Sequence, residues 1–251
     1  MKIAILTPTR SRPEKLYRFI RSVINTASGE NTIFLYISID RNDPDKSNYI
    51  TAYRKIVADQ CANDALHIFT DNNNFIILNT GDQKPVGIIW NDLQELAEKM
   101  YSPDYYIMGN DDLVYRTKDW DQILVGNLES LPHKYFVSWF NDEINGQSHC
   151  AFPIVSDQWI QQVGYFTPTI FEFLCNDTWV FDIAKRINCL NYIPEVVASH
   201  LHFTQGKSEY DQTYRQWRDN GATGRDLKLF NETGDLRQEK ADELNKIIKA
   251  L

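Results

Sequence analysis

The stretch Tyr105-Tyr106-Ile107-Met108-Gly109-Asn110-Asp111-Asp112 places a short apolar run directly before two adjacent carboxylates. Such a run is typical of a strand that is buried on both faces. In an open α/β sheet, ligands bind just beyond the carboxyl ends of the strands. Mg²⁺ and Mn²⁺ take oxygen ligands there, commonly one or two carboxylates together with substrate phosphates. The stretch therefore predicts a site for a metal-bound diphosphate, although Asn, Asp and Gly are also the ordinary residues of a polar turn.

Strands and helices alternate through the first half of the sequence. Lys2–Leu6 and Ile33–Ile39 are nearly continuous apolar runs. Between them apolar residues recur at helical spacing from Leu16 to Ile24, and Ser11 with Glu14 fits a capping box. The same patterns predict helices over Ser47–Cys61 and Pro85–Met100 and strands over Leu66–Thr70, Phe75–Leu78 and Tyr105–Met108. This alternation predicts an α/β fold with a mostly parallel central sheet flanked by helices.

The second half is less regular and predicts a small antiparallel part. Its expected elements are strands over Tyr135–Trp139, His149–Phe152 and Tyr192–Val197, and helices over Ser156–Val163, Asn176–Asn188 and Leu236–Leu251. Beyond Thr204 the chain is polar and charged, and no linker separates it from the rest. We therefore expect one domain over residues 1–205 and a helical C-terminal extension, residues 206–251, packed on it.

The composition is that of a soluble globular protein with a core of normal size. Of the 251 residues, 43% are hydrophobic and 24% are charged, and the formal net charge is −8. An acidic chain lacks the basic field that broad, non-specific nucleic-acid binding requires, although basic residues near the N-terminus form a local positive patch. The four cysteines form no C-x-x-C pair, and no apolar run approaches the length of a transmembrane helix. These features predict reduced thiols and a cytoplasmic location.

Several motifs follow one another in a recognisable order. Thr7-Pro8-Thr9-Arg10 ends the first strand, Asp40 ends the second, and the acidic stretch follows Met108. Later come Gly164-Tyr165-Phe166-Thr167-Pro168, then Asn176-Asp177 at a helix start, then the pair His200 and His202. Over about the first 205 residues this pattern resembles a GT-A fold glycosyltransferase, most similar to the family 2 type.

The resemblance implies a transferase that takes a hexosyl or pentosyl group from a nucleotide-diphosphate sugar. A UDP-sugar is the expected donor, Mn²⁺ or Mg²⁺ the expected cofactor, and inversion at the sugar carbon the expected outcome. Carried over by position, the residues that would border the nucleotide are Pro8, Thr9 and Arg10, and Asp40 would contact the base. Asp112 would bind the metal, with Asn110 and Asp111 beside the diphosphate. Because Asn110 stands where the family commonly has the first Asp of its D-x-D motif, the site has one carboxylate fewer.

The chemistry of sugar transfer also requires positive charge beside the diphosphate. A diphosphate leaving group gains charge as the glycosidic bond breaks, and a divalent cation neutralises that charge. Arg10 or Lys84 could add a fixed positive charge, although Arg10 could also be an ordinary solvated surface residue. On the helix after Lys84 the resembling family often has a basic residue and an Asn near the donor. Here Trp90 replaces the basic residue, so only Asn91 is carried over, and Trp90 suits the core.

Asp177 is the predicted general base. A sugar hydroxyl attacks poorly unless a positioned carboxylate accepts its proton. Asn176-Asp177-Thr178 also precedes a helical pattern, so either Asp177 or Asn176 could simply cap that helix. In an extended segment His200 and His202 would point to one side. In the resembling family a histidine here can complete the metal shell, and a neutral imidazole binds Mn²⁺ acceptably; a buried, hydrogen-bonded His is the alternative.

The sequence does not determine which acceptor receives the sugar. A soluble glycan, a lipid-linked sugar or a hydroxymethylated base in DNA would each present a suitable hydroxyl. The C-terminal extension interleaves aromatic and basic residues (Tyr210, Tyr214, Arg215, Trp217, Arg218, Arg225), which makes it the best place for acceptor recognition if it is not simply a solvated helix face. A catalytically inert nucleotide-sugar-binding module is the second alternative, because Asn110 weakens the acidic triplet. Neither a Gly-rich triphosphate loop nor a G-x-G-x-x-G motif follows the first strand.

Overall fold

The computed structural model describes residues 1–49, 51, 67–71 and 73–251. The helix predicted over Ser47–Cys61 lies largely outside these residues. Nine strands of the described chain form a sheet in the order β3-β4-β2-β1-β5-β8-β7-β9-β6. Its first-half strands are β1 (Lys2–Thr9), β2 (Thr32–Asp40), β3 (His67–Asp71), β4 (Asn74–Gly81) and β5 (Tyr105–Met108). The α/β architecture predicted from the sequence is confirmed.

The central strands β4, β2, β1 and β5 pair in parallel. β2 lies on one side of β1 and β5 on the other, so the chain reverses its winding direction between β1 and β5. In open α/β sheets such a switch point opens a crevice at the carboxyl ends of the two strands. Thr9 ends β1 and Gly109 follows β5, so the acidic stretch opens into that crevice.

The remaining strands make the antiparallel part. They are β6 (Leu113–Tyr115), β7 (Val137–Asn141), β8 (Ile154–Ser156) and β9 (Leu190–His200). β8 pairs antiparallel with β5, and β6 pairs antiparallel with β9. The strand predicted over His149–Phe152 is absent from its predicted place: the chain there is irregular and the strand begins at Ile154. Pro153 cannot donate to a ladder, and it precedes the first paired residue.

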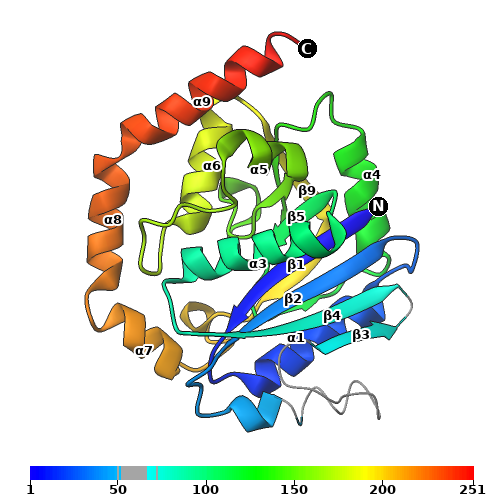
Figure 1. Ribbon diagram of the computed structural model, residues 1–251, viewed down its shortest axis with the longest axis vertical. Helices are drawn as coiled ribbons and strands as arrows, with labels where there is room; N and C mark the ends of the chain where they lie inside the picture. Colours follow the sequence, from blue (N-terminus) through cyan, green and yellow to red (C-terminus); the bar gives the residue numbers. More distant parts are fainter. Residues whose placement is uncertain (50, 52–66, 72) are drawn as a thin grey trace.

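Helices cover both faces of the sheet (Figure 1). Alternate residues of β1 point to opposite faces, so Ile3 and Ile5 join one core and Ala4 and Leu6 the other. The first core contains α1 (Pro13–Thr26) and α4 (Trp120–Glu129), whereas the second contains α3 (Val86–Tyr101), α5 (Asp157–Val163) and α6 (Asn176–Arg186). None of the helices in the described part of the chain combines the length and the apolar character that crossing a bilayer requires.

The N-terminus of α1 differs from the predicted capping box. Ser11 has a positive φ of 53°, and Arg12 is the N-cap residue without a side-chain cap bond. The Ser11 backbone N–H instead donates to Asp43 (2.8 Å), and Pro13 occupies the first helical turn. A contact from the loop after β2 therefore replaces the local cap, and this turn directs Arg12 toward the crevice.

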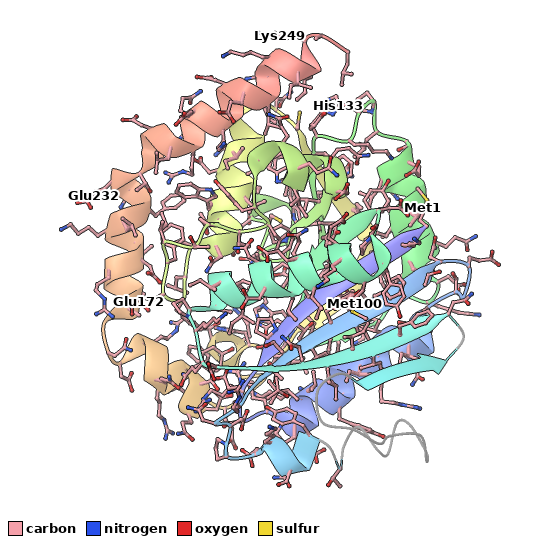
Figure 2. The ribbon with its side chains drawn as sticks, viewed as in Figure 1. Met1, Met100, His133, Glu172, Glu232 and Lys249 are labelled. Atoms are coloured by element: carbon pink, nitrogen blue, oxygen red, sulfur yellow. The ribbon has the colours of Figure 1, made fainter. Side chains whose placement is uncertain are left out.

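The C-terminal extension consists of α7 (Gln212–Arg218), α8 (Ala222–Glu232) and α9 (Gly234–Ile248), which run in succession along one edge of the molecule (Figure 1). Ala241 and Leu244 of α9 are fully buried in the second core, and Arg237 pairs with Asp182 of α6 at 2.6 Å. The loop before α6 meets α8 at Glu172, labelled in Figure 2, which forms an ion pair with Arg225. A domain boundary at residue 205 stays a prediction, and these contacts cross it.

Candidate active site

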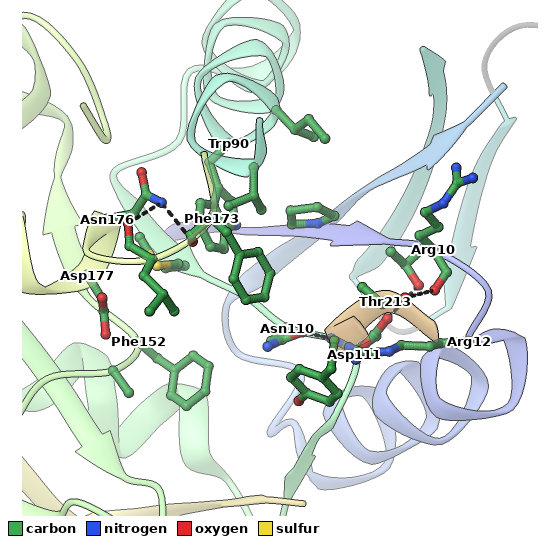
Figure 3. Close-up of a pocket in the computed structure, with 18 of the residues that line it drawn as sticks. Arg10, Arg12, Trp90, Asn110, Asp111, Phe152, Phe173, Asn176, Asp177 and Thr213 are labelled. Carbon is green, nitrogen blue, oxygen red and sulfur yellow. Dashed lines mark hydrogen bonds and ion pairs between the residues drawn. The ribbon is translucent and has the colours of Figure 1, made fainter. Parts of the chain in front are cut away.

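A cavity of about 250 Å³ lies at the switch point between β1 and β5 (Figure 3). Its lining comes from seven stretches that are far apart in the sequence. They are Pro8 to Arg12, Asp40, Gln83 to Trp90, Met108 to Asp111, Ala151 with Phe152, Phe173 to Asp177, and, near the C-terminus, His200, His202, Thr213, Tyr214 and Arg218. The extension therefore contributes directly to the cavity. In Figure 3 Asp111 and Asp177 lie toward opposite ends of it.

The residues predicted to border the nucleotide meet at one end. Pro8, Thr9, Arg10 and Asp40 all line the cavity. Arg10 donates to the Asp40 carboxylate (2.7 Å) and to the Asn42 side chain (2.8 Å). Burial raises the pKa of Asp40, and the hydrogen bond from Arg10 opposes that rise. Asp40 thus has a cationic partner in the protein. A nucleobase that contacts Asp40 would therefore meet the ion pair between Arg10 and Asp40.

Asp111 faces the cavity but is neutralised by protein groups. Its side chain is 1% exposed. The Thr9 hydroxyl donates to Oδ2 at 2.6 Å and the Arg12 guanidinium to Oδ1 at 3.1 Å. Burial raises the pKa of Asp111, and the charge of Arg12 offsets part of that rise. Arg12 itself donates twice to Asp211, the residue before α7, at 2.8 and 3.0 Å.

Asp112 points away from the cavity lining, toward β9 and α7. It is fully buried, and its Oδ2 accepts from the Tyr214 hydroxyl at 3.0 Å. Its Oδ1 lies 3.4 Å from His200 Nε2, yet neither of these two atoms makes a hydrogen bond. Burial alone would raise the pKa of Asp112, but His200, Arg12 and the Tyr214 hydroxyl together lower it. The side chain is therefore a carboxylate with one oxygen that lacks a hydrogen-bond partner.

These orphaned atoms fit a divalent cation. Asp112 Oδ1 and His200 Nε2 are a mixed oxygen and nitrogen pair, which Mn²⁺ accepts. Among the described residues, no three His, Cys, Asp or Glu side chains could hold an ion by themselves. Diphosphate oxygens and water would therefore have to complete the coordination shell, as is usual for Mg²⁺ in phosphate sites.

His202 is less well placed than His200 as a ligand. Its ring centroid lies 5.0 Å from that of His200, and burial lowers its pKa to about 4, so the ring is neutral at neutral pH. Its Nδ1 lies 2.7 Å from the Thr204 hydroxyl oxygen and 3.3 Å from the Thr204 backbone nitrogen. A metal bound at Nδ1 would have to displace both of these contacts.

The turn after β5 is fixed by two local features. A Cβ on Gly109 would collide with the Thr7 hydroxyl and lie 3.0 Å from the Leu6 carbonyl, so only glycine allows β5 to leave the sheet this close to β1. The Asn110 side chain accepts from the Asp111 backbone N–H at 2.9 Å and lines the cavity. Asn110 thus shapes the acidic turn, whatever it contacts in a ligand.

Asp177 lies at the other end of the cavity, in the first turn of α6. Cys175 is the N-cap residue of this helix and no side chain caps it, so the capping alternative for Asp177 and Asn176 is wrong. The Asp177 carboxylate instead accepts from the Thr178 hydroxyl (3.2 Å) and lies 3.1 Å from His149 Nε2. Its side chain is 27% exposed, beside the apolar walls formed by Phe152 and Leu174. It is therefore free to meet a hydroxyl.

Asp226 of α8 fixes the chain that leads to Asp177. This residue is 2% exposed, and its carboxylate accepts from the backbone N–H groups of Glu172, Phe173 and Leu174 at 2.8–2.9 Å. Phe173 and Leu174 line the cavity. A helix of the extension therefore shapes the wall beside the predicted base.

Two predicted donor residues differ in their surroundings. Lys84 lines the cavity mouth, is 42% exposed and pairs with Asp92 at 2.5 Å. Asn91 does not line the cavity. Its amide donates to the Thr167 carbonyl (2.7 Å) and accepts from the Phe166 backbone N–H (3.0 Å), which fastens α3 to the segment before α6. These hydrogen bonds give Asn91 a structural role, and its predicted donor contact stays a prediction.

The sequence-based reasoning missed four residues of the site: Arg12, His149, Tyr214 and Arg218. Arg12 appeared only as one of several N-terminal basic residues, and Tyr214 and Arg218 only in a mixed aromatic and basic segment. Each acquires its place through contacts with distant parts of the chain; Arg12 and Asp211, for example, are 199 positions apart. The short spacing from Arg10 to Arg12 was the single local signal available.

No protein-family model matches this sequence, and no curated protein sequence does. Solved structures do match the fold. TarS 1-349 from S. aureus in complex with UDP has a TM-score of 0.54 at 9% identity, over 79% of this chain and 60% of that one. The mannosyltransferase PcManGT from Pyrobaculum calidifontis in complex with GDP-Man and Mn²⁺ has a TM-score of 0.58 at 9% identity, over 90% and 61%.

A third structure, GalNAc-T7 with UDP, GalNAc and Mn²⁺, has a TM-score of 0.59 at 9% identity and covers 80% of this chain and 44% of that one. The chain thus spans about three fifths or less of the length of these proteins. Together the likenesses show that the chain has the GT-A fold, as the sequence predicts. At these identities they show the fold alone, and membership of family 2 is not shown.

Proposed function

We propose that this chain is a glycosyltransferase that moves a sugar from a nucleotide-diphosphate donor to an acceptor hydroxyl. One observation supports the proposal above all: a cavity at the sheet switch point has the buried Asp111, next to Asp112, at one end and the partly exposed Asp177 at the other. A donor needs a cationic or metal-binding end for its diphosphate, and an acceptor needs a base.

At the diphosphate end, Arg10 and Arg12 line the cavity, but Asp40, Asp111 and Asp211 already balance their charge. When bound between Asp112 and His200, a divalent cation would neutralise the charge that develops on the departing diphosphate. Because three similar structures contain UDP or a UDP-sugar and one contains GDP-Man, a UDP-sugar is the first donor to test and GDP-Man the second.

At the other end, Asp177 accepts the proton of the acceptor hydroxyl as that oxygen attacks the anomeric carbon. Attack from the side opposite the diphosphate would invert that carbon. The walls beside Asp177 are apolar (Ala151, Phe152, Leu174), so the acceptor hydroxyl would react in a site with little competing water.

The test measures the release of nucleoside diphosphate from a panel of UDP- and GDP-sugars. Each donor is assayed with Mn²⁺, with Mg²⁺ and with EDTA. The assay is run first without an acceptor and then with glycans, lipid-linked sugars or hydroxymethylated DNA. Metal-dependent release that an acceptor accelerates supports the proposal. Donor binding by calorimetry without any release would indicate the inert binding module instead.

A further inference from the structure

His149 is the ionisable side chain that contacts Asp177 among the described residues. The two side chains approach at 3.1 Å, between His149 Nε2 and Asp177 Oδ2. Asp177 lines the cavity whereas His149 does not. A residue in this position does not touch substrate, but it determines where the carboxylate points and how much charge it presents.

The position of His149 is built by a fastened loop. The buried Asp142, after β7, accepts from the backbone N–H groups of Ile144 (3.0 Å) and Asn145 (2.7 Å), and Trp139 Nε1 donates to the Gly146 carbonyl at 2.8 Å. The loop continues through the single turn η1 (Gly146–Ser148) directly into His149. Phe181 of α6 then packs its ring against the imidazole, edge to face, with centroids 5.4 Å apart.

The charges around His149 are carboxylates. Asp177 faces it directly, and Asp142 acts from the loop; the hydrogen bond to Asp177 is the main cause that raises the pKa of His149, and burial opposes it. The neighbouring Cys150 is fully buried, which raises its thiol pKa well above the usual range, so it stays neutral. His149 is therefore the group of this cluster that changes charge near neutral pH.

We propose that His149 is a positioning residue that holds the Asp177 carboxylate toward the acceptor and adjusts its strength as a base. The inference rests on the proposed function. A neutral imidazole donates Nε2–H to Oδ2 and leaves Oδ1, which accepts from the Thr178 hydroxyl at 3.2 Å, with a second lone pair for the acceptor proton. A protonated imidazole makes the same contact as an ion pair, which engages the carboxylate with the imidazolium rather than with the acceptor proton.

Activity should therefore rise with pH as His149 loses its proton. We expect wild-type kcat to show a step with a midpoint above 6.5 and His149→Gln, which keeps a donor without the charge, to lack it. At pH 8 we expect kcat to fall about 3-fold in His149→Gln and about 30-fold in His149→Ala, part of the ~10²–10⁴-fold that a general base contributes, with donor KM within about 2-fold. His133→Gln, at a histidine that contacts Cys189 outside the cavity, is the matched control.

A second measurement needs no turnover. The imidazole carbon shifts of the five histidines, followed by NMR against pH, give the His149 midpoint once His149→Gln assigns it. Asp177→Asn should move that midpoint down, toward about 6.5. An unmoved midpoint, or a pH step that persists in His149→Gln, would overturn the inference. If Asp177→Asn moves the midpoint as expected but the wild type releases no nucleoside diphosphate from any donor, the proposed function is overturned. The contact between His149 and Asp177 would then still stand.

Discussion

The two carboxylate centres of the cavity are held in opposite ways. Asp111 and Asp112 are at most 1% exposed, and three of their four oxygens accept hydrogen bonds from Thr9, Arg12 and Tyr214. Asp177 is 27% exposed and has one ionisable partner, a histidine. A group with fixed, buried partners suits a ligand whose charge persists, whereas a group that gains and loses a proton in every cycle needs solvent access and a tunable neighbour.

Asp177→Asn tests the exposed centre and should have the largest effect. It removes the proposed base but keeps the size of the side chain, so kcat should fall by about 10³-fold, equivalent to about 4 kcal/mol of barrier. Donor KM and the melting temperature should change little. Nucleoside diphosphate release under saturating donor measures this, with Asp219→Asn, an exposed position of the extension, as control. Transfer near the wild-type rate would show that the two centres do not divide the chemistry as described.

His200→Ala tests the buried centre. We expect the apparent affinity for Mn²⁺ to fall by about 10–100-fold, because Asp112 loses the imidazole that faces its unpartnered oxygen. Activity against Mn²⁺ concentration, and direct Mn²⁺ titration by electron paramagnetic resonance, would both report it. His133→Ala should leave both measurements unchanged. Equal Mn²⁺ binding by the wild type and His200→Ala would remove His200 from the metal site.

Asp226→Asn tests whether the wall beside Asp177 is preorganised by the extension. An amide can accept through one atom only, so at least one of the three backbone donors loses its partner, at a cost of about 1–3 kcal/mol in the free energy of unfolding. Urea denaturation measures that cost. We expect a parallel rise in acceptor KM and little change in donor KM; the reverse pattern would place the acceptor elsewhere.

Asp211→Asn should have the smallest effect. Burial alone would raise the pKa of Asp211, but hydrogen bonds from Arg12 and Lys15 lower it to about 2, below its ordinary 3.8. The carboxylate therefore stabilises the fold fully above pH 4, and that contribution disappears as pH falls toward 2. Allowing for partial exposure, we expect the variant to be about 1 kcal/mol less stable at pH 7. The difference from wild type in thermal denaturation should shrink between about pH 4 and pH 2. A constant difference would contradict the ion-pair origin.

The sequence predicts the sheet better than it predicts the site. Buried parallel strands such as Ile33–Ile39 can be recognised in a sequence as continuous apolar runs, because both of their faces are covered. The polar residues that follow such strands lie together at one edge of the sheet. That argument correctly brings Thr9, Arg10, Asp40 and Asp111 together in one cavity. It also predicts the general place of Asp177, since a helix start faces the same edge.

The local sequence pattern does not determine in which direction a side chain of the site points. Whether Asp111 or Asp112 faces the cavity depends on Tyr214, 102 positions beyond Asp112. The capping box at Ser11 fails because Asp43 accepts the Ser11 N–H. The cap at Asp177 fails because the N-cap residue of α6 is Cys175, which has a left-handed backbone. At Asp112 and at Ser11 a tertiary contact decides the outcome against a weak local preference.

The hydrogen bonds that Asp226 accepts from the backbone of residues 172–174 have a consequence for biosynthesis. The sheet and the predicted base leave the ribosome well before α8, yet the wall around that base needs the carboxylate of α8. A nascent chain arrested near residue 205 would carry every strand of the sheet and still lack a finished cavity. Enzymatic competence would thus arrive late in translation, and stalled chains of graded length would reveal the residue at which it begins.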